Sequence, residues 1–98
     1  MWKVTMTEVE VAGLKKEIKE VILEALNIKN IKPEDIKDNA PLFAKDNILG
    51  LDSIDAIELI MAIQKHFKVR IADQNLARHI LESIDTIAEF LVKEKGSS

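Results

Sequence analysis

Hydrophobic and polar residues recur with a helical period in three long stretches of this chain. In the first, apolar side chains return at steps of three and four residues and charged side chains fill the other side, as in an amphipathic helix. Thr7 followed by Glu10 fits a capping box, which places the start of this helix at or near Thr7. We expect a buried stripe of Val11, Leu14, Ile18, Val21, Ile22 and Ala25. We expect a solvated face of Lys15, Lys16, Glu17, Lys19, Glu20 and Glu24.

The second stretch, Leu49 to Phe67, begins with a turn at Gly50 and continues as a long apolar helix. Asp52 is the expected N-cap, and Asp55 adds a carboxylate in the first turn, where the helix dipole favours it. At about 100° per residue the apolar side chains fall on two faces. One face is expected to join the core: Ala56, Leu59, Ile60, Ile63 and Phe67. The other, Ile54, Ile57 and Met61, is either covered by another element or exposed as a contact surface.

The third stretch predicts a last helix that is capped by Ser83, with Ile84, Ile87, Ala88 and Leu91 on one stripe. Before it, Asp73 is expected to cap a short helix through residues 74–77, after an extended connector in which Ile71 points inward.

Residues 27–51 form a long connection, and Pro33 is expected to open a short helical turn within it. Ile31 and Ile36 should pin this loop to the core, and Leu42 and Phe43 should act as core plugs. The fold class is therefore all-α, a small four-helix bundle of three longer helices and one short helix with a long first loop. We expect one domain over residues 1–98, with a core at about 7–95 and a flexible tail at 96–98.

The composition of the chain excludes or disfavours several classes of protein. The chain has 98 residues, of which 47% are hydrophobic and 32% charged, which suits a compact fold but leaves no room for a separate catalytic lobe. Cysteine is absent, so neither a disulfide framework nor a thiol nucleophile is available. The net charge of -3 and the lack of a basic run disfavour nucleic acid as a partner. No apolar run is long enough for a membrane span, and we expect a cytoplasmic monomer.

Ser53 stands at the start of the apolar helix, but the sequence does not support it as a catalytic nucleophile. A serine needs a neighbouring base, and only His66 and His79 are available. His66 lies thirteen residues along the same helix, roughly 20 Å away by helical rise, whereas distance does not exclude His79. Asp52, Asp55 and Glu58 have no second cluster to complete a metal site, so we expect no catalytic residue and no bound metal.

A serine at a helix mouth, flanked by acids and followed by an apolar strip, resembles the acyl carrier protein family. The likeness continues through most of the chain, and its specific part is the Asp-Ser-Ile motif in its helical context. The residues that carry it are Gly50, Leu51, Asp52, Ser53, Ile54, Asp55, Ile57, Glu58, Leu59, Met61 and Phe67.

The resemblance implies that Ser53 receives a 4'-phosphopantetheine arm from coenzyme A through a phosphopantetheinyl transferase. It also implies that the chain carries acyl groups as thioesters for fatty acid, polyketide or related lipid biosynthesis, and that it is no enzyme itself. Acyl synthases, ligases and transferases would read a partner surface of Asp52, Ile54, Asp55, Ile57, Glu58 and Met61. In that family the acid before the serine also helps to hold the transferase's magnesium, which assigns that role to Asp52.

Two features depart from the family's usual pattern. Residues 44–49 make the loop before the motif a few residues longer, and the far end of the motif helix carries Gln64, Lys65 and His66, followed by Lys68 and Arg70, where fatty-acid carriers are acidic. We therefore expect a specialised carrier with dedicated partners. The alternatives are an aminoacyl or peptidyl carrier, an unmodified helical adaptor that binds through Ile54, Ile57 and Met61, and a small hydrolase that uses Ser53.

Overall fold

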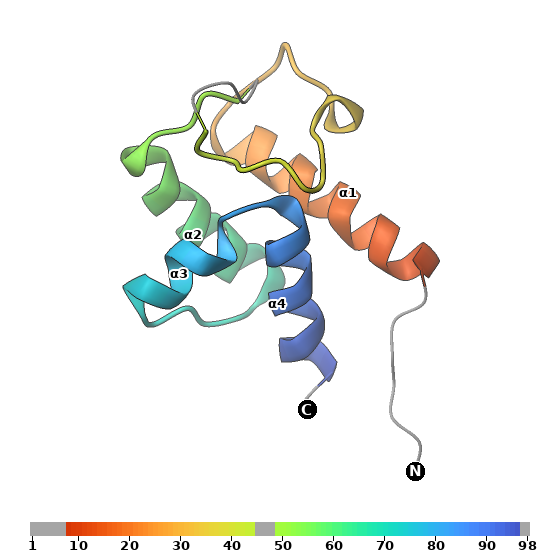
Figure 1. Ribbon diagram of the computed structural model, residues 1–98, viewed down its shortest axis with the longest axis vertical. Helices are drawn as coiled ribbons and strands as arrows, with labels where there is room; N and C mark the ends of the chain where they lie inside the picture. Colours follow the sequence, from red (N-terminus) through yellow and green to blue (C-terminus); the bar gives the residue numbers. More distant parts are fainter. Residues whose placement is uncertain (1–7, 45–48, 97–98) are drawn as a thin grey trace.

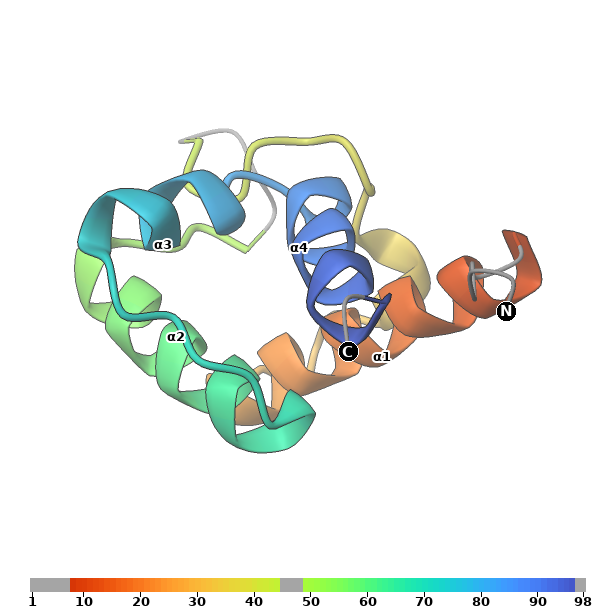
Figure 2. The ribbon, with the colours of Figure 1, turned by 90° about the horizontal axis from the view of Figure 1, so that it is seen from below.

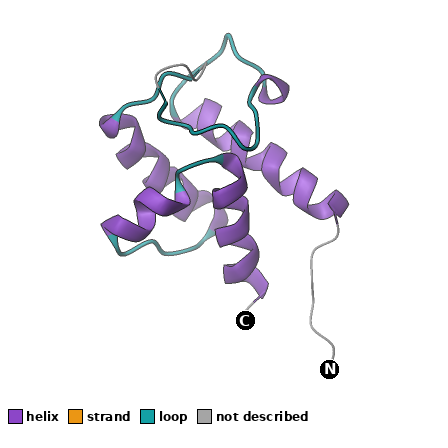
Figure 3. Cartoon of the chain, viewed as in Figure 1, coloured by secondary structure: helices purple, strands orange, loops and turns teal. Residues whose placement is uncertain are grey.

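The computed structural model describes residues 8–44 and 49–96, and within these ranges the chain is a bundle of four α-helices without a β-strand (Figures 1 and 3). The helices are α1 (Glu8–Ala25), α2 (Ser53–Phe67), α3 (Gln74–Ile80) and α4 (Ile84–Gly96). A short 3-10 helix, η1 (Pro33–Asp35), lies in the long loop after α1. The all-α four-helix prediction is confirmed. The expectations for the Thr7 cap, for residues 45–48 and for the tail at 97–98 lie outside the described residues.

Helix α1 packs against both α2 and α4, and α3 packs against α4. Figure 2 shows α2 and α3 on one side of the molecule, with α4 between α3 and α1. The apolar stripes of the helices meet in one core, which is the main source of the fold's stability. The predicted core residues Leu14, Ile18, Leu59, Ile63, Ile84 and Leu91 are all buried.

The charged face of α1 differs from the expectation, because part of it is paired rather than solvated. Lys15 Nζ lies 2.7 Å from Asp85 Oδ1 on α4, and Lys19 Nζ lies 2.6 Å from Asp38 Oδ1 in the long loop. The spacing along α1 identifies its outward face, but it does not reveal that the loop and α4 place carboxylates over that face.

Two backbone hydrogen bonds fasten the long loop to the start of α4. Leu42 N donates to Glu82 O at 2.9 Å, and Asp85 N donates to Asp38 O at 2.9 Å. Leu42 is fully buried, as predicted for a core plug. Phe43 is only half-buried, so it is not the full plug that the sequence predicted.

The caps of the last two helices are confirmed. Asp73 Oδ1 accepts a hydrogen bond from Asn75 N at 3.0 Å, and Ser83 Oγ accepts one from Thr86 N at 3.2 Å. Helix α3 continues to Ile80, three residues beyond the predicted end, because Ile80 and the following Leu81 are buried in the core. Helix α4 includes Gly96, which was expected to begin the tail.

The connector between α2 and α3 is held by a side chain of α2. Gln64 Oε1 accepts a hydrogen bond from Ile71 N at 2.8 Å, and Ile71 is buried, as predicted. This contact fixes α3 relative to the far end of α2.

Candidate functional site

The site is built at the first turn of α2, where the chain arrives from a tight bend. Leu49 and Leu51 are buried on either side of Gly50, which is exposed. Gly50 adopts φ +56°, a left-handed conformation that a side chain would strain. Apart from Gly50 itself and its two chain neighbours, a Cβ at this position would meet no heavy atom of the described residues within 4 Å, so the conformation and not the available space favours glycine here. The bend directs residues 52–54 toward solvent.

A reciprocal capping box closes the start of α2. Asp52 Oδ1 accepts hydrogen bonds from Ile54 N and Asp55 N, each 3.1 Å long. Asp55 Oδ2 accepts one from Asp52 N, also at 3.1 Å. Three backbone amide groups at the start of the helix are thereby satisfied, and two negative charges stand at the positive end of the helix. The predicted N-cap is confirmed.

Ser53 is the first residue of α2, and it is exposed. Within the described residues its hydroxyl makes no hydrogen bond to a histidine, so a base that would activate it is not found there. His66 lies at the far end of α2, with Nε2 2.7 Å from Glu17 Oε2 on α1. His79 is exposed on α3. This geometry presents the hydroxyl to an external reagent.

Acidic and imidazole side chains do not form a metal centre in the part of the chain that the structure describes: no group of three or more suitable ligands is found there. Asp52 and Asp55 are occupied as capping groups, and Glu58 is exposed on the next turn.

The second apolar face of α2 is exposed. Ile54, Ile57 and Met61 keep 69%, 61% and 64% of their surface, so cover by α3 or by the long loop, the alternative from the sequence, is wrong for this structure. These three residues, which we call the α2 strip, stand beside Asp55 and Glu58. An exposed apolar strip that is bordered by acids is typical of a protein-binding surface.

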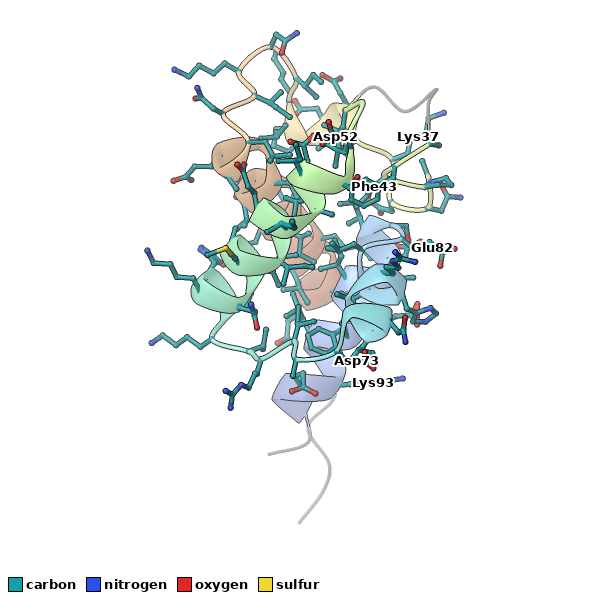
Figure 4. All side chains as sticks on the ribbon, turned by 90° about the vertical axis from the view of Figure 1, so that its left-hand side faces the viewer. Lys37, Phe43, Asp52, Asp73, Glu82 and Lys93 are labelled. Carbon is teal, nitrogen blue, oxygen red and sulfur yellow. The ribbon has the colours of Figure 1, made fainter. Side chains whose placement is uncertain are left out.

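A cleft opens between α2 and α3 directly beside Ser53. Its walls combine the first turns of α2, the end of α3 and the long loop, and its lining is mainly apolar. The lining residues are Phe43, Leu51, Asp52, Ser53, Ala56, Ile57, Ile60, Ala77, Arg78 and Leu81. Figure 4 looks onto this side, with Asp52 at the start of α2 and Phe43 next to it. Sequence reasoning missed the part that α3 plays, because no pattern along the chain says which helix lies opposite Ser53.

The opposite end of α2 is basic. Lys65, Lys68 and Arg70 are exposed and border a shallow hollow together with Met61. Within the described residues these three cations form no ion pair. The exposed surface of α2 is therefore acidic at the Ser53 end, apolar in the middle and basic at the far end.

A family model for the phosphopantetheine attachment site matches residues 16–91. The chain belongs to the acyl carrier protein family. It is similar to the acyl carrier protein of Wolinella succinogenes, with 41% identity over 58 residues, which are 59% of this chain and 68% of that relative. It is also similar to the acyl carrier protein of Sulfurovum sp. (strain NBC37-1), with 34% identity over 73 residues, 74% of this chain and 83% of the relative. The chain thus has a carrier role, and its cofactor is a covalently attached 4'-phosphopantetheine.

The geometry of this carrier fits such an arm. Ser53 has an exposed hydroxyl, and the apolar cleft between α2 and α3 lies beside it. The structure has no helix, among the residues it describes, with the length and apolar character needed to span a bilayer.

Proposed function

We propose that this chain is an acyl carrier protein that bears its phosphopantetheine arm on Ser53 and that it contributes no catalytic group itself. Its cargo would be acyl intermediates, held as thioesters for fatty acid, polyketide or related lipid biosynthesis. The observation that carries the proposal is the exposed hydroxyl of Ser53 at the capped start of α2.

The other serines support this assignment by their positions. Ser83 is 6% exposed, and its hydroxyl is hydrogen-bonded within the cap of α4, so a transferase would have to unfold that cap to reach it. Ser97 and Ser98 lie beyond the residues matched by the family model. Ser53 is the serine that combines exposure with a place inside the matched range.

The modification would be a phosphoryl-group transfer to the serine hydroxyl. The transferase supplies the base that removes the proton from Ser53 Oγ, since no histidine contacts it within the described residues. The bond from Oγ to phosphorus forms as the bond from phosphorus to the leaving group breaks, which releases adenosine 3',5'-bisphosphate from coenzyme A. The carrier's own part is to hold Oγ still and exposed.

The surface around Ser53 would serve as the docking site for the transferase and for acyl-handling enzymes. The α2 strip offers apolar contact area, with Met61 able to adapt to partners of different shape. Asp52, Asp55 and Glu58 would meet basic side chains, and Asp52 would also face the transferase's magnesium.

The cleft between α2 and α3 offers an entry for part of an acyl chain. Ile18, Leu59, Ile63, Ile84 and Leu91 are completely buried in the structure, so a chain reaches the core only if the helices part slightly. Changes in the amide signals of α2 and α3 on acyl loading would support this sheltering, and an unchanged spectrum would refute it.

The basic end of α2 supports a specialised carrier. An enzyme that binds a continuous acidic face along α2 would meet Lys65, Lys68 and Arg70 as like charges, which lowers its association rate. A dedicated partner would instead combine a basic region near its active-site mouth with an acidic region farther away.

Intact mass measurement tests the proposal. The chain is incubated with coenzyme A, magnesium and a broad-specificity phosphopantetheinyl transferase. The wild type should gain one phosphopantetheine and Ser53→Ala none, whereas the matched control Ser83→Ala should still gain one. A modified Ser53→Ala variant, or an unmodified wild type, would refute the assignment.

A further inference from the structure

The N-terminus of α2 has fewer free backbone amides to donate hydrogen bonds to a phosphate than a helix N-terminus usually has. A free helix N-terminus binds anions through its unpaired amides. Here Ile54 N and Asp55 N already donate to Asp52, and Asp52 N donates to Asp55. Ala56 N donates to Asp52 O at 3.1 Å. A phosphodiester on Ser53 would therefore stand next to two carboxylates while most of the nearby amides are occupied, so a cation from another element would offset the repulsion.

Arg78 is the cation that the fold brings to this place. It lines the cleft that also contains Ser53 and Asp52, and it reaches the cleft from α3. Of the side chains that line this cleft, Asp52 and Arg78 are the charged ones. Arg78 thus lies on the wall of the cleft that α3 forms, and Ser53 lies on the wall that α2 forms.

The charge of Arg78 is available for such an anion. Lys15, Lys19 and His66 are paired with carboxylates, but Arg78 forms no ion pair within the described residues. Glu82, one helical turn later, is exposed and is not in ion-pair contact with Arg78. An exposed guanidinium is hydrated when it has no anionic partner. Because it is planar, it can donate two parallel hydrogen bonds to two oxygens of one phosphate.

The backbone that presents Arg78 is held firmly. Its neighbour Ala77 is 4% exposed and Leu81 is 2% exposed, and both line the same cleft. Asp73 caps the start of α3, and Gln64 ties the preceding connector to α2. The side chain can therefore move while its anchor stays in place, which suits a group that binds an arm after the arm has been attached.

We propose that Arg78 binds the phosphate of the arm on Ser53 and holds the first part of the arm against the cleft between α2 and α3. This inference rests on the proposed attachment at Ser53. It assigns Arg78 a role as an arm-binding residue, with the phosphodiester as its ligand.

The test compares wild type, Arg78→Gln, Arg78→Lys and the control Arg70→Gln, each converted by the transferase and verified by intact mass. Arg70 is exposed and lies beside the hollow at the far end of α2, away from the cleft lining. The readouts are the ³¹P chemical shift of the attached phosphate and the arginine side-chain N–H signals before and after modification. A purely structural role of Arg78 would change the unmodified protein but would leave the phosphorus signal alone.

We expect the phosphorus signals of wild type and Arg70→Gln to coincide, that of Arg78→Gln to be displaced, and that of Arg78→Lys to lie between them. High salt should move the wild-type signal toward that of Arg78→Gln, because screening weakens an exposed contact. Identical phosphorus signals in all four modified proteins, with an Arg78 side-chain signal that does not respond to modification, would overturn the inference and leave the attachment at Ser53 standing. If the wild type gains no mass at all, both the attachment at Ser53 and the role of Arg78 are overturned.

Discussion

Asp52 and Asp55 each accept a hydrogen bond from the backbone amide of the other across the first turn of α2, and both bonds are 3.1 Å long. Ser53 lies between them in sequence and has no freedom to leave the helix start while both bonds are intact. The two carboxylates that would meet a partner's basic side chains therefore also fix the backbone that carries the hydroxyl. Structural and docking roles are combined in the same side chains, and substitutions must be chosen to separate them.

Asp52→Asn and Asp52→Ala separate these roles. Asparagine is as good an N-cap as aspartate, so Asp52→Asn should keep nearly the wild-type stability, whereas Asp52→Ala should lose about 1 kcal/mol. Both variants lack the charge proposed to face the transferase's magnesium, so both should be modified more slowly. Urea unfolding and the initial rate of arm attachment measure the two effects. An Asn variant that is modified at the wild-type rate would restrict Asp52 to a capping role.

Ile57 and Ile63 form a matched pair on opposite faces of α2, with 61% and 0% of their surface exposed. Ile57→Ala should change the free energy of unfolding by about 0.5 kcal/mol or less. Ile63→Ala should cost about 2–5 kcal/mol because it leaves a cavity in the core. For docking we expect the opposite ranking of the two variants. In the transferase reaction, Ile57→Ala should raise the KM for the carrier more than Ile63→Ala does. This comparison is made under conditions in which Ile63→Ala is folded. Equal KM values for Ile57→Ala and wild type would remove Ile57 from the docking surface.

Lys15 joins α1 to α4 and to the long loop, and its pairing should appear in the pH dependence of stability. The hydrogen bond to Asp85 raises the pKa of Lys15, opposed in part by burial, and the nearby Asp85, Asp38 and Glu89 carboxylates add to the increase. Because the pKa is raised on folding, the stabilisation is fully present below the ordinary lysine pKa of about 10.4 and is lost as the pH rises through the folded value.

Lys15→Gln should therefore lower the free energy of unfolding by about 0.2–1 kcal/mol at neutral pH, and the difference from wild type should shrink at strongly alkaline pH. The control Lys16→Gln changes an exposed lysine of the same helix that is not in the ion pairs with Asp38 and Asp85. It should have little effect on the free energy of unfolding. Chemical unfolding across the alkaline range makes the comparison. A Lys15→Gln effect that grows with pH would contradict this account of the pairing.

Lys65 and Lys68 should slow docking to enzymes that bind a continuous acidic α2. The double variant Lys65→Glu and Lys68→Glu should raise kcat/KM with an acyltransferase of a general fatty-acid system, by about tenfold at low ionic strength and less at high salt. The control pair Lys29→Glu and Lys37→Glu makes the same charge change on the long loop and should have little effect. The specialised-carrier proposal would be contradicted if the wild-type chain already reacted with the general fatty-acid acyltransferase as fast as that system's own carrier does.

The caps of α2, α3 and α4 were predictable because each depends on residues close together in sequence. Asp52 with Asp55, Asp73 with Asn75, and Ser83 with Thr86 all act over two or three positions, and the apolar stripes follow the helical period. The two faces of α2 were assigned correctly for the same reason: Leu59 and Ile63 are buried, and Ile54, Ile57 and Met61 are exposed.

The contacts between distant segments were not predictable. No local pattern says that Asp38 and Asp85 lie over the charged face of α1, or that Phe43 stops at the edge of the core. The sequence analysis did not single out Arg78, because its place in the cleft that also contains Ser53 depends on how α3 docks on α4. The site's local chemistry could be derived from the sequence, but the opposite wall of its cleft required the tertiary structure.

Peptide mapping of the modified protein tests the central claim most directly. Cleavage after Lys45 and Lys65 yields peptide 46–65, in which Ser53 is the only residue with a hydroxyl side chain. After treatment with coenzyme A, magnesium and the transferase, we predict that the whole mass increase is found on this peptide. An increase on the peptide that contains Ser83 or at the C-terminal serines, or no increase on any peptide, would contradict the assignment of Ser53 as the carrier's attachment residue.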